Sequence, residues 1–202
     1  VANICGNKMF MTLLLEKNNI PSPKTYFSFS SASAAENLEK VGFPLVIKPI
    51  IGSWGRGVMP LKDKDTMEAV FEIRDITDSP HDRIYYLQEM INRPPRDIRV
   101  ITVGDEPIAA MYRKSSGGFK TNIALGADPE ICEITKEMED LAVKASKAMG
   151  GGILGIDMME DEKRGLVVHE VNNTVEFKGL ARVAKRNIPK EMIEYALNYV
   201  RK

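Results

Sequence analysis

The sequence predicts an α+β fold whose sheets are mainly antiparallel, and three observations lead to this prediction. Two pairs of apolar, β-branched segments are each joined by a short polar turn, as in β-hairpins: residues 97–103 with 106–113, and residues 154–160 with 166–171. Residues 135–149 place apolar side chains at helical spacing and are followed by three consecutive glycines. Hairpins combined with amphipathic helices favour an α+β arrangement.

The chain has 202 residues, which is enough for one large domain or two small ones. Its 28 basic and 28 acidic residues cancel, whereas a nucleic-acid-binding protein normally carries a basic excess. Cys5 and Cys132 lie far apart and have no metal-type spacing to a histidine, which disfavours a zinc site and a disulfide framework and fits a reducing cytoplasm. No apolar segment approaches the length of a membrane span, and no signal peptide is visible.

The first part of the chain predicts helices and short strands. Asn7 can cap a helix at about residues 8–18, and Lys8 lies in its first turn, where a cation is unfavourable unless it serves an anionic ligand. Because the chain enters this helix almost at once and lacks a starting Met, we expect a piece of a longer protein. A capping box begins at Ser33, and Gly42 is expected to end that helix in a left-handed conformation. Strands are also predicted at 24–29, 43–49 and 84–91, and a helix at 65–75.

A glycine-rich loop at residues 51–58 joins two of the predicted strands. Its three glycines let the backbone adopt positive φ and approach a ligand, and successive N–H groups in such a loop can bind an anion. It is not a Walker A loop, because no Gly-Lys-Ser/Thr opens a helix after it. An ordinary hairpin loop is the alternative. Lys48, on the strand just before the loop, favours a flap that covers phosphates.

The hairpin at 154–171 carries oxygen ligands at strand spacing. Strand alternation places Glu170 and Asn172 on one face, and His169 and Val171 on the other. Carboxylate and carboxamide oxygens are ligands that Mg²⁺ accepts. A surface hairpin with scattered polar residues is the alternative interpretation.

The position of Asp157 depends on the register of this hairpin. If residues 162–165 form a four-residue turn, Asp161 pairs with Leu166 and Asp157 faces Glu170. A slip by one residue would move Asp157 to the wrong face of the sheet. The predicted register therefore completes a candidate metal site.

Charged side chains recur elsewhere in the second half. Alternation places Asp97 and Arg99 on one face of their strand, which suggests the wall of a cleft rather than the core. Residues 114–126 form a long glycine-rich loop with cations and amide groups, and loops of this length are often functional. The last helix has Pro189 in its first turn and is expected to bury Met192, Ile193, Ala196, Leu197 and Val200.

These features follow one another in a specific order: a helix lysine, a Phe-Pro-Leu-Val-Ile-Lys-Pro strand, a glycine-rich flap, a Leu-Gln-Glu-Met-Ile strand, Asp-Ile-Arg, and then an Asp followed by Glu-Val-Asn. Over nearly the whole chain, this order resembles the ATP-grasp superfamily and, within it, the RimK-like amino-acid ligases. The resemblance implies an ATP-grasp fold, with two α/β subdomains whose mainly antiparallel sheets enclose a nucleotide cleft. Residues 1–86 would form the central lid subdomain with its leading helix, and residues 87–202 the C-terminal subdomain. An N-terminal domain would be missing.

The resemblance also implies roles for individual residues. Lys48 and Arg113 would be catalytic, and Asp157, Glu170 and Asn172 would bind Mg²⁺, with two ions expected. ATP would be bound by Lys8, Lys48, Gly52, Ser53, Trp54, Gly55, Arg56, Gly57, Val58, Gln88, Glu89, Met90, Ile91, Asp97, Arg113 and Asn122. The amino-acid substrate would be bound by Ile123, Ala124, Thr174, Val175, Glu176, Phe177 and Lys178.

Residues 170–178 look most like the ligases that join 2-aminoadipate to the C-terminal glutamate of the carrier protein LysW in lysine biosynthesis, while a sister group uses glutamate. The implied partners are therefore 2-aminoadipate or glutamate and a small acidic, LysW-like carrier. That carrier would dock on a local basic patch such as Arg182, Lys185 and Arg186. A homo-oligomer, commonly a tetramer, is also implied, without nucleic-acid or membrane partners.

Several other functions compete with this interpretation. A protein kinase also has a glycine flap and a strand lysine, but its His-Arg-Asp and Asp-Phe-Gly motifs are absent from the sequence. A nucleotide-binding module without catalysis and a scaffolding domain remain as alternatives. The sequence shows no convincing Ser-His-Asp or Cys-His set, which disfavours a covalent enzyme intermediate. Phosphoryl transfer through an acyl phosphate instead needs positioning and charge neutralisation.

Overall fold

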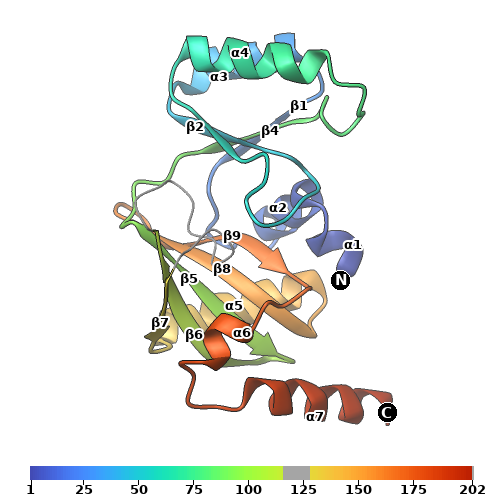
Figure 1. Ribbon diagram of the computed structural model, residues 1–202, viewed down its shortest axis with the longest axis vertical. Coiled ribbons are helices and arrows are strands. Elements are labelled where there is room, and N and C mark those ends of the chain that lie inside the picture. The colour runs from blue at the N-terminus through green and yellow to red at the C-terminus, as the bar shows by residue number, and fades with distance from the viewer. Residues whose placement is uncertain (116–127, 202) are drawn as a thin grey trace. The chain divides into compact units, whose positions relative to one another are not determined.

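The computed structural model of the protein describes residues 1–115 and 128–201 (Figure 1). Its elements are α1 (Ala2–Cys5), α2 (Lys8–Lys17), β1 (Thr25–Ser28), α3 (Ser31–Val41), β2 (Leu45–Lys48), β3 (Met59–Leu61), α4 (Lys64–Asp75), β4 (Tyr85–Glu89), β5 (Arg96–Val103), β6 (Glu106–Lys114), β7 (Asp128–Cys132), α5 (Lys136–Met149), β8 (Ile153–Asp161), β9 (Gly165–Asn172), α6 (Lys178–Ala181) and α7 (Ile188–Val200).

The strands form two sheets, one in the order β1-β4-β2-β3 and the other in the order β7-β6-β5-β8-β9. The strand pairs that join these neighbours are all antiparallel. The predicted α+β fold with mainly antiparallel sheets is therefore confirmed. None of the helices in the described residues is long and apolar enough to cross a membrane.

Contacts between residues group the chain into two compact units. The four-stranded unit comprises residues 7–9 and 23–91, and the five-stranded unit comprises residues 1–6, 10–22 and 92–202. The predicted ranges 1–86 and 87–202 differ from this grouping, because most of α2 groups with the five-stranded unit and all of β4 lies in the four-stranded unit. As limits of two subdomains, the predicted ranges stay a prediction.

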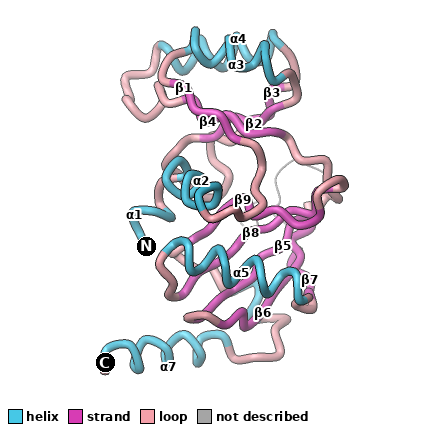
Figure 2. Tube along the Cα trace, turned by 180° about the vertical axis from the view of Figure 1, so that it is seen from behind, coloured by secondary structure: helices cyan, strands magenta, loops and turns pink. Residues whose placement is uncertain are grey.

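In the four-stranded unit, helices α3 and α4 cover one face of the sheet (Figures 1 and 2). Leu45 and Ile47 of β2 point toward these helices, while Val46 and Lys48 belong to the other face, as strand alternation predicts. The apolar core of the unit consists of Ala34, Leu38, Leu45, Ile47, Leu61, Met67, Val70, Phe71, Tyr85 and Leu87.

Both ends of α3 differ from the prediction. The helix is capped by Ser30, whose Oγ accepts a hydrogen bond from the backbone N–H of Ser33 at 3.2 Å. The expected capping box at Ser33 is therefore wrong, because an earlier serine in this serine-rich segment takes the capping position. Gly42 has φ 83° and ψ 177°, so its φ is positive but the predicted left-handed cap does not form. Gly150 does end α5 in the left-handed conformation, with φ 98° and ψ 13°.

In the five-stranded unit, α5 packs on one face of the sheet (Figure 2). The core on that face includes Ile98, Val100, Ala110, Ile156, Met158, Val168, Leu141, Ala145 and Met149. The opposite face carries a smaller apolar cluster of Ile101, Ile108, Ala109, Met111, Leu180 and Ile188. Strand β7 was not predicted. It lies at the sheet edge, a position that tolerates its Pro129.

The turn between β8 and β9 is one residue shorter than predicted. Asp161 pairs with Gly165 rather than with Leu166. The Asp161 carboxylate closes the turn by accepting from the backbone N–H groups of Lys163 and Arg164 at 2.8 and 3.1 Å. Gly165 follows with φ +76°, a conformation that favours glycine. The predicted pairing of Asp161 is therefore wrong by one residue.

A β-bulge opposite Asp157 and Met158 compensates for this shift. Met158 pairs with Val168, whereas Asp157 pairs with Glu170, so His169 is the extra residue of the bulged strand. The predicted pairing of Asp157 with Glu170 is therefore confirmed, although the turn that was expected to produce it is different.

Helix α7 uses a different face from the predicted one. Ile188 is buried, and Tyr195 lies against Gly104, whose added Cβ would be 2.9 Å from the tyrosine ring. Ile193, Leu197 and Val200 are 60%, 51% and 84% exposed. The predicted burial is therefore wrong for Ile193, Ala196, Leu197 and Val200. Helix α7 has apolar side chains on two of its faces, and the sequence does not show which face packs against the sheet.

Candidate active site

Charged side chains gather on one face of the five-stranded sheet because of its register. Asp97 of β5 pairs with Arg113 of β6, and Arg99 of β5 pairs with Asp157 of β8. Asp157 in turn pairs with Glu170 of β9. Side chains at directly opposed positions lie close together on one face, so three pairings assemble five charged groups.

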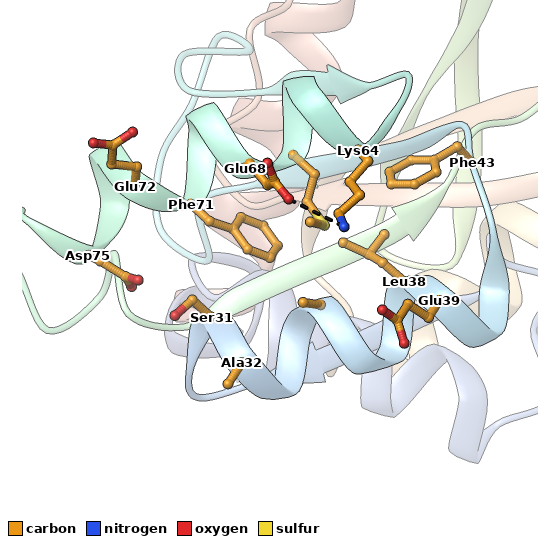
Figure 3. A pocket seen from close by; sticks show the side chains of 12 residues that line it. Ser31, Ala32, Leu38, Glu39, Phe43, Lys64, Glu68, Phe71, Glu72 and Asp75 are labelled. Atoms are coloured by element: carbon orange, nitrogen blue, oxygen red, sulfur yellow. Dashed lines mark ion pairs between the residues drawn. The ribbon is translucent and has the colours of Figure 1, made fainter.

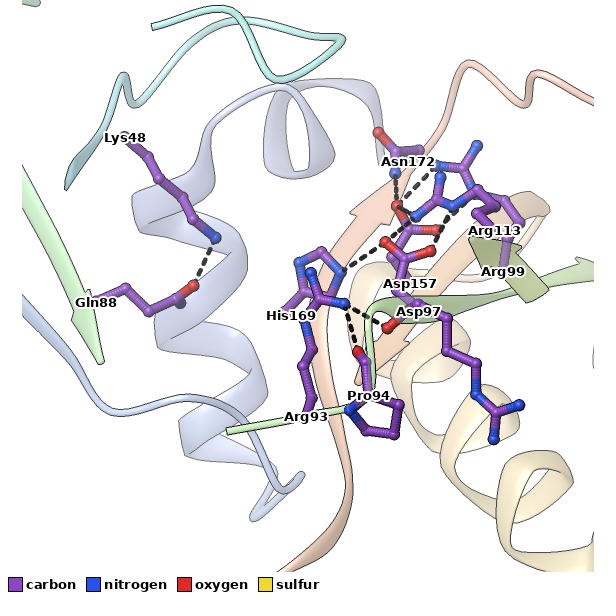
Figure 4. A network of polar contacts seen from close by, with 11 residues as sticks. Lys48, Gln88, Arg93, Pro94, Asp97, Arg99, Arg113, Asp157, His169 and Asn172 are labelled. Carbon is purple, nitrogen blue, oxygen red and sulfur yellow. Dashed lines mark hydrogen bonds and ion pairs between the residues drawn. The ribbon is translucent and has the colours of Figure 1, made fainter. Parts of the chain in front are cut away.

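Both arginines bind a carboxylate through two nitrogens (Figure 4). Nε and Nη2 of Arg113 donate to Oδ1 and Oδ2 of Asp97 at 2.6 and 2.8 Å. Nε and Nη2 of Arg99 donate to Oδ1 and Oδ2 of Asp157 at 2.5 and 2.7 Å. Nη2 of Arg113 also lies 3.1 Å from Oδ2 of Asp157. These contacts form one network of alternating charges across β6, β5 and β8.

The network is buried, and its members keep each other ionised. Asp157 is 1% exposed and Arg113 is 4% exposed. Burial alone would raise the pKa of the Asp157 carboxyl, but the charges of Arg113 and Arg99 outweigh it and hold that pKa well below its usual range. Burial would lower the pKa of Arg113, but Asp157 and Asp97 raise it. Asp157 and Arg113 therefore stay charged at neutral pH.

The predicted metal ligands lie together beside this network. Asp157 and Glu170 are directly opposed on paired strands, and Nδ2 of Asn172 donates to Oδ2 of Asp157 at 3.3 Å. Two carboxylates and an amide oxygen are hard ligands of the kind that Mg²⁺ takes, so the donor set fits that ion. In the part of the chain that the structure describes, no three His, Cys, Asp or Glu side chains form a metal cluster. The proposed set therefore needs the oxygen of Asn172.

His169 lies on the charged face, where strand alternation did not place it. Its Nε2 is 4.0 Å from Oδ2 of Asp97 (Figure 4). The bulge lets His169 and Glu170 follow one another on the same face, so the predicted orientation of His169 toward the face of Val171 is wrong. The signal for this bulge is a change of phase in the apolar residues, because Leu166 and Val168 face the core at alternate positions while the next core residue is Val171.

Lys48 is held in a second network, within the four-stranded unit. The lysine is 8% exposed, and its Nζ donates to Oε1 of Gln88 at 2.5 Å (Figure 4). Nε2 of Gln88 donates to Thr25 Oγ1 and to the Tyr86 hydroxyl, both at 2.9 Å. Strand alternation predicts the orientation of Lys48, but the sequence did not single out Thr25 or Tyr86.

The glycine-rich loop joins β2 and β3, which are antiparallel neighbours, as the predicted flap requires. Positive φ occurs at Gly52, Trp54, Gly55 and Gly57, which bends the backbone repeatedly. The remaining predicted loop contacts are Ser53, Arg56 and Val58, and the guanidinium of Arg56 lies 4.9 Å from the centre of the exposed Trp54 ring.

Lys8 ties this loop to the start of helix α2. Its Nζ donates to the carbonyl of Gly52 at 2.9 Å, and its backbone N–H donates to the carbonyl of Ile50 at the same distance. This contact accounts for a cation in the first turn of a helix, where the helix dipole disfavours it. Lys8 therefore lies at the glycine-rich loop, and its contact with ATP phosphates stays a prediction.

The predicted adenine segment lies at the end of β4. Oε1 of Glu89 accepts from the backbone N–H of Lys24 at 2.7 Å. Met90 and Ile91 lie beyond the last residue of the strand and are half-buried. The side chain of Gln88 accepts a hydrogen bond from Lys48, so Gln88 takes part in the candidate site through its side chain as well as through its backbone.

The predicted substrate segment is only partly polar. Val175 and Phe177 pack against the apolar cluster under α6, whereas Thr174, Glu176 and Lys178 are exposed. The alternation means that the last three remain available to a ligand while the first two hold the segment in place. The predicted residues Asn122, Ile123 and Ala124 lie outside the described residues.

Two cavities of the molecule contain none of the residues predicted to bind ATP, Mg²⁺ or the amino acid, although Lys185 and Arg186 of the predicted carrier patch line the second. One, of about 500 Å³, lies between α3 and α4 and is lined by residues including Leu38, Phe43, Met67 and Phe71 (Figure 3). The other, of about 340 Å³, is lined by β6 and β7 and by residues 184–186. The charged networks therefore mark the candidate site better than cavity size does.

Comparison with known proteins agrees with this arrangement. The chain matches the RimK-like ATP-grasp domain over residues 5–196. It is 41% identical over 198 residues to the alpha-aminoadipate–LysW ligase LysX of Saccharolobus solfataricus, covering 98% of this chain and 72% of that protein. It is 33% identical to the glutamate–LysW ligase ArgX of Sulfolobus acidocaldarius, covering 97% of this chain and 70% of that protein.

A solved RimK domain protein from Sphaerobacter thermophilus has the same fold. It superimposes with a TM-score of 0.79 at 21% identity, and the match covers 96% of this chain and 68% of that one. The predicted ATP-grasp fold is confirmed by this likeness. The family match over residues 5–196, with the 41% identity to LysX, shows that the chain belongs to the RimK-like ATP-grasp family.

Proposed function

We propose that the protein is an ATP-dependent carboxylate–amine ligase that joins 2-aminoadipate to the C-terminal glutamate of a small acidic, LysW-like carrier in lysine biosynthesis. Membership of the ATP-grasp family supports the ligase class. The higher identity to LysX than to ArgX supports 2-aminoadipate over glutamate. The geometric observation that carries the proposal is the opposed pair Asp157 and Glu170, with Asn172 beside it and two buried arginines next to it.

The reaction would proceed in two balanced steps. An oxygen of the carrier carboxylate attacks the γ-phosphorus of ATP, the bond to the β–γ bridging oxygen breaks, and ADP leaves. The amine nitrogen of the amino acid then attacks the acyl carbon, phosphate leaves with the carbon–oxygen bond electrons, and the nitrogen loses a proton. Both steps build up negative charge on phosphate oxygens, so fixed cations would stabilise them.

Arg113 is suited to that role by the way its carboxylate partners hold it. Nε and Nη2 are engaged with Asp97 and Asp157, whereas Nη1 has no hydrogen-bond partner among the described residues. The guanidinium is therefore oriented before a ligand arrives, and one N–H₂ group remains for a phosphate oxygen. Lys48 and Lys8 would contact other phosphate oxygens, and the loop at 52–58 would close over them.

The ATP site would use two Mg²⁺ ions, held by Asp157, Glu170 and Asn172. When bound, Mg²⁺ would neutralise charge on the phosphate oxygens. The two arginines beside Asp157 compensate its charge in the absence of an ion, which keeps this carboxylate ionised and ready to bind one. Residues 88–91 would line the base and ribose, and Asp97 would orient Arg113.

The proposal also assigns residues that would contact the amino-acid substrate and the carrier protein. Thr174, Glu176 and Lys178 offer a hydroxyl, an anion and a cation to a small amino acid. For an acidic carrier, Arg182 and Lys185 are exposed, whereas Arg186 is already paired with Glu191 and Glu106. A cytoplasmic homo-oligomer, with a tetramer expected from the family, completes the proposal.

The test is ADP formation by the protein with ATP, Mg²⁺, a carrier that ends in glutamate, and either amino acid. Release of ADP that needs both carrier and amino acid is expected, with kcat/KM at least about tenfold higher for 2-aminoadipate, since one methylene changes binding by roughly 1–3 kcal/mol. A preference for glutamate would favour the ArgX-type or RimK-type alternative. ATP binding without ADP formation would favour a non-catalytic nucleotide-binding module.

A further inference from the structure

Lys48 stands at the end of a directed chain of hydrogen bonds in the four-stranded sheet. The hydroxyl of Thr25 donates to the carbonyl of Pro23 at 2.9 Å. Nε2 of Gln88 donates to Thr25 Oγ1 and to the Tyr86 hydroxyl, both at 2.9 Å, and Oε1 of Gln88 accepts from Nζ of Lys48 at 2.5 Å. The chain crosses β1, β4 and β2, three neighbouring strands of one sheet.

The direction of this chain follows from the chemistry of its ends. The Thr25 proton is committed to the carbonyl of Pro23, so Oγ1 is an acceptor toward Gln88. An ammonium group can only donate, so Lys48 needs an acceptor on the other side. Only one orientation of the Gln88 amide meets both demands, with Nε2 toward the hydroxyls and Oε1 toward the lysine. The hydroxyls therefore decide which end of the amide the lysine meets.

Burial and ring packing keep the chain in place. Gln88 is 3% exposed and Tyr86 is fully buried. The Tyr86 ring meets the ring of Phe27 edge-on, with centroids 5.4 Å apart and planes at 67°. Lysine has a long flexible stem, so placing its ammonium group before a ligand arrives requires such a fixed acceptor.

We propose that Thr25 and Tyr86 are positioning residues that act through Gln88 to hold the Lys48 ammonium ready for nucleotide phosphate. The inference rests on the proposed function only in taking Lys48 as a phosphate contact. Loss of either hydroxyl removes one of the two acceptors of Gln88 Nε2 and loosens the amide, so that more of the ordering of Lys48 has to occur when the nucleotide binds. The effect is specific to phosphate, because the Gln88 side chain points to Lys48, whereas residues 88–91 would meet the base and ribose through their backbone.

The test compares titrations of ADP with Mg²⁺ and of adenosine into wild-type protein, Thr25→Val and Tyr86→Phe. Each variant should weaken ADP binding about two- to tenfold, the range expected for one buried hydrogen bond, and leave adenosine binding unchanged. Thr25→Ser keeps the hydroxyl and should restore wild-type affinity. Tyr85→Phe is the matched control, because the neighbouring Tyr85 hydroxyl bonds Asp75 and its ring lies in the helix-covered core.

Each outcome decides the matter. A selective loss of ADP affinity that Thr25→Ser rescues supports the inference. Equal losses for ADP and adenosine, or unchanged ADP binding in both hydroxyl variants, overturn it while leaving the ligase proposal in place. Folded wild-type protein that binds neither compound overturns the proposed function and this inference with it. Thermal unfolding of every variant shows whether it is folded in the titration.

Discussion

Asp157 is the residue on which the candidate site depends most. Its carboxylate is the pairing partner of Glu170, the acceptor for Arg99, Arg113 and Asn172, and 1% exposed. If this negative charge is removed, the buried guanidinium groups of Arg99 and Arg113 lose a carboxylate that balances their positive charge. A buried ion pair adds little net stability over apolar residues, but removing one partner is costly. Asp157 is therefore both a structural counter-charge and a proposed metal ligand.

We predict that Asp157→Asn lowers the free energy of unfolding by about 3–5 kcal/mol, measured by urea denaturation. The substitution leaves the buried guanidinium groups of Arg99 and Arg113 without one of their negatively charged partners. Glu160→Gln on the same strand is the control. Glu160 also receives two bonds from an arginine, Arg96, but the two side chains are 29% and 31% exposed, so the loss should stay below about 1 kcal/mol. Equal losses in the two variants would contradict this account of the network.

Tyr85 gives the protein a predictable dependence on alkaline pH. Burial, followed by the hydrogen bond to Asp75, raises the pKa of Tyr85 to about 12, while an unfolded tyrosine has a pKa of about 10. The folded state binds this proton more tightly, so its stabilising contribution is complete below about pH 10 and is lost as the pH rises to about 12.

Denaturation of Tyr85→Phe at a series of alkaline pH values should therefore show a shallower fall in stability over that interval. Part of the slope will remain, because a hydrogen bond with Cys132 and burial also raise the pKa of Tyr112 to about 12. Ultraviolet absorbance reports the ionisation of both rings directly. An unchanged slope in Tyr85→Phe would show that Tyr85 ionises as readily in the folded protein as in the unfolded chain.

At the residue scale, the sequence predicted the charged groups better than it predicted their partners. Lys48 and Glu170 follow from strand alternation, a rule that needs no knowledge of neighbouring strands, whereas Asp157 follows from the predicted register of its hairpin. Thr25 and Tyr86 contact Gln88 across or along strands, so their role depends on the sheet order β1-β4-β2, which alternation does not contain.

At the element scale, the β8–β9 hairpin shows how one correct contact can follow from an incorrect turn. The observed turn is one residue shorter than predicted, and a bulge at His169 restores the pairing of Asp157 with Glu170. A turn and a bulge each depend on local backbone energy and on what the sheet demands. The sequence alone does not determine the length of the turn or the position of the bulge. The burial of the apolar residues on both strands does limit which combinations of turn and bulge are possible.

The two faces of helix α7 should differ in how much they contribute to stability. Ile188→Ala should lower the free energy of unfolding by about 2–5 kcal/mol, because the side chain is buried. Leu197→Ala on the same helix should change it by no more than about 0.5 kcal/mol, because that side chain is half exposed. Urea denaturation at low protein concentration measures both. A large cost for Leu197→Ala would mean that the second apolar face is covered in the folded protein.

At the scale of the whole molecule, the fold was predictable because its hairpins and amphipathic helices are strongly patterned. Strand β7 was not, since Asp128 and Pro129 disfavour a strand by composition and only the edge of a completed sheet accommodates them. The grouping of most of α2 with the five-stranded unit was also not predictable, because Met11 and Leu15 join the core of segments far along the chain. Such long-range packing has no local signature.

The most direct test of the account is calorimetric titration of ADP into the protein with and without Mg²⁺, repeated on Glu170→Gln, Asp157→Asn and the control Glu160→Gln. We predict Mg²⁺-dependent binding in wild-type protein and Glu160→Gln, weakened about tenfold or more in folded Glu170→Gln and Asp157→Asn, as expected when a metal site is damaged. Binding of equal strength without Mg²⁺ and in Glu170→Gln, or no binding by folded wild-type protein, would contradict the assignment of this site.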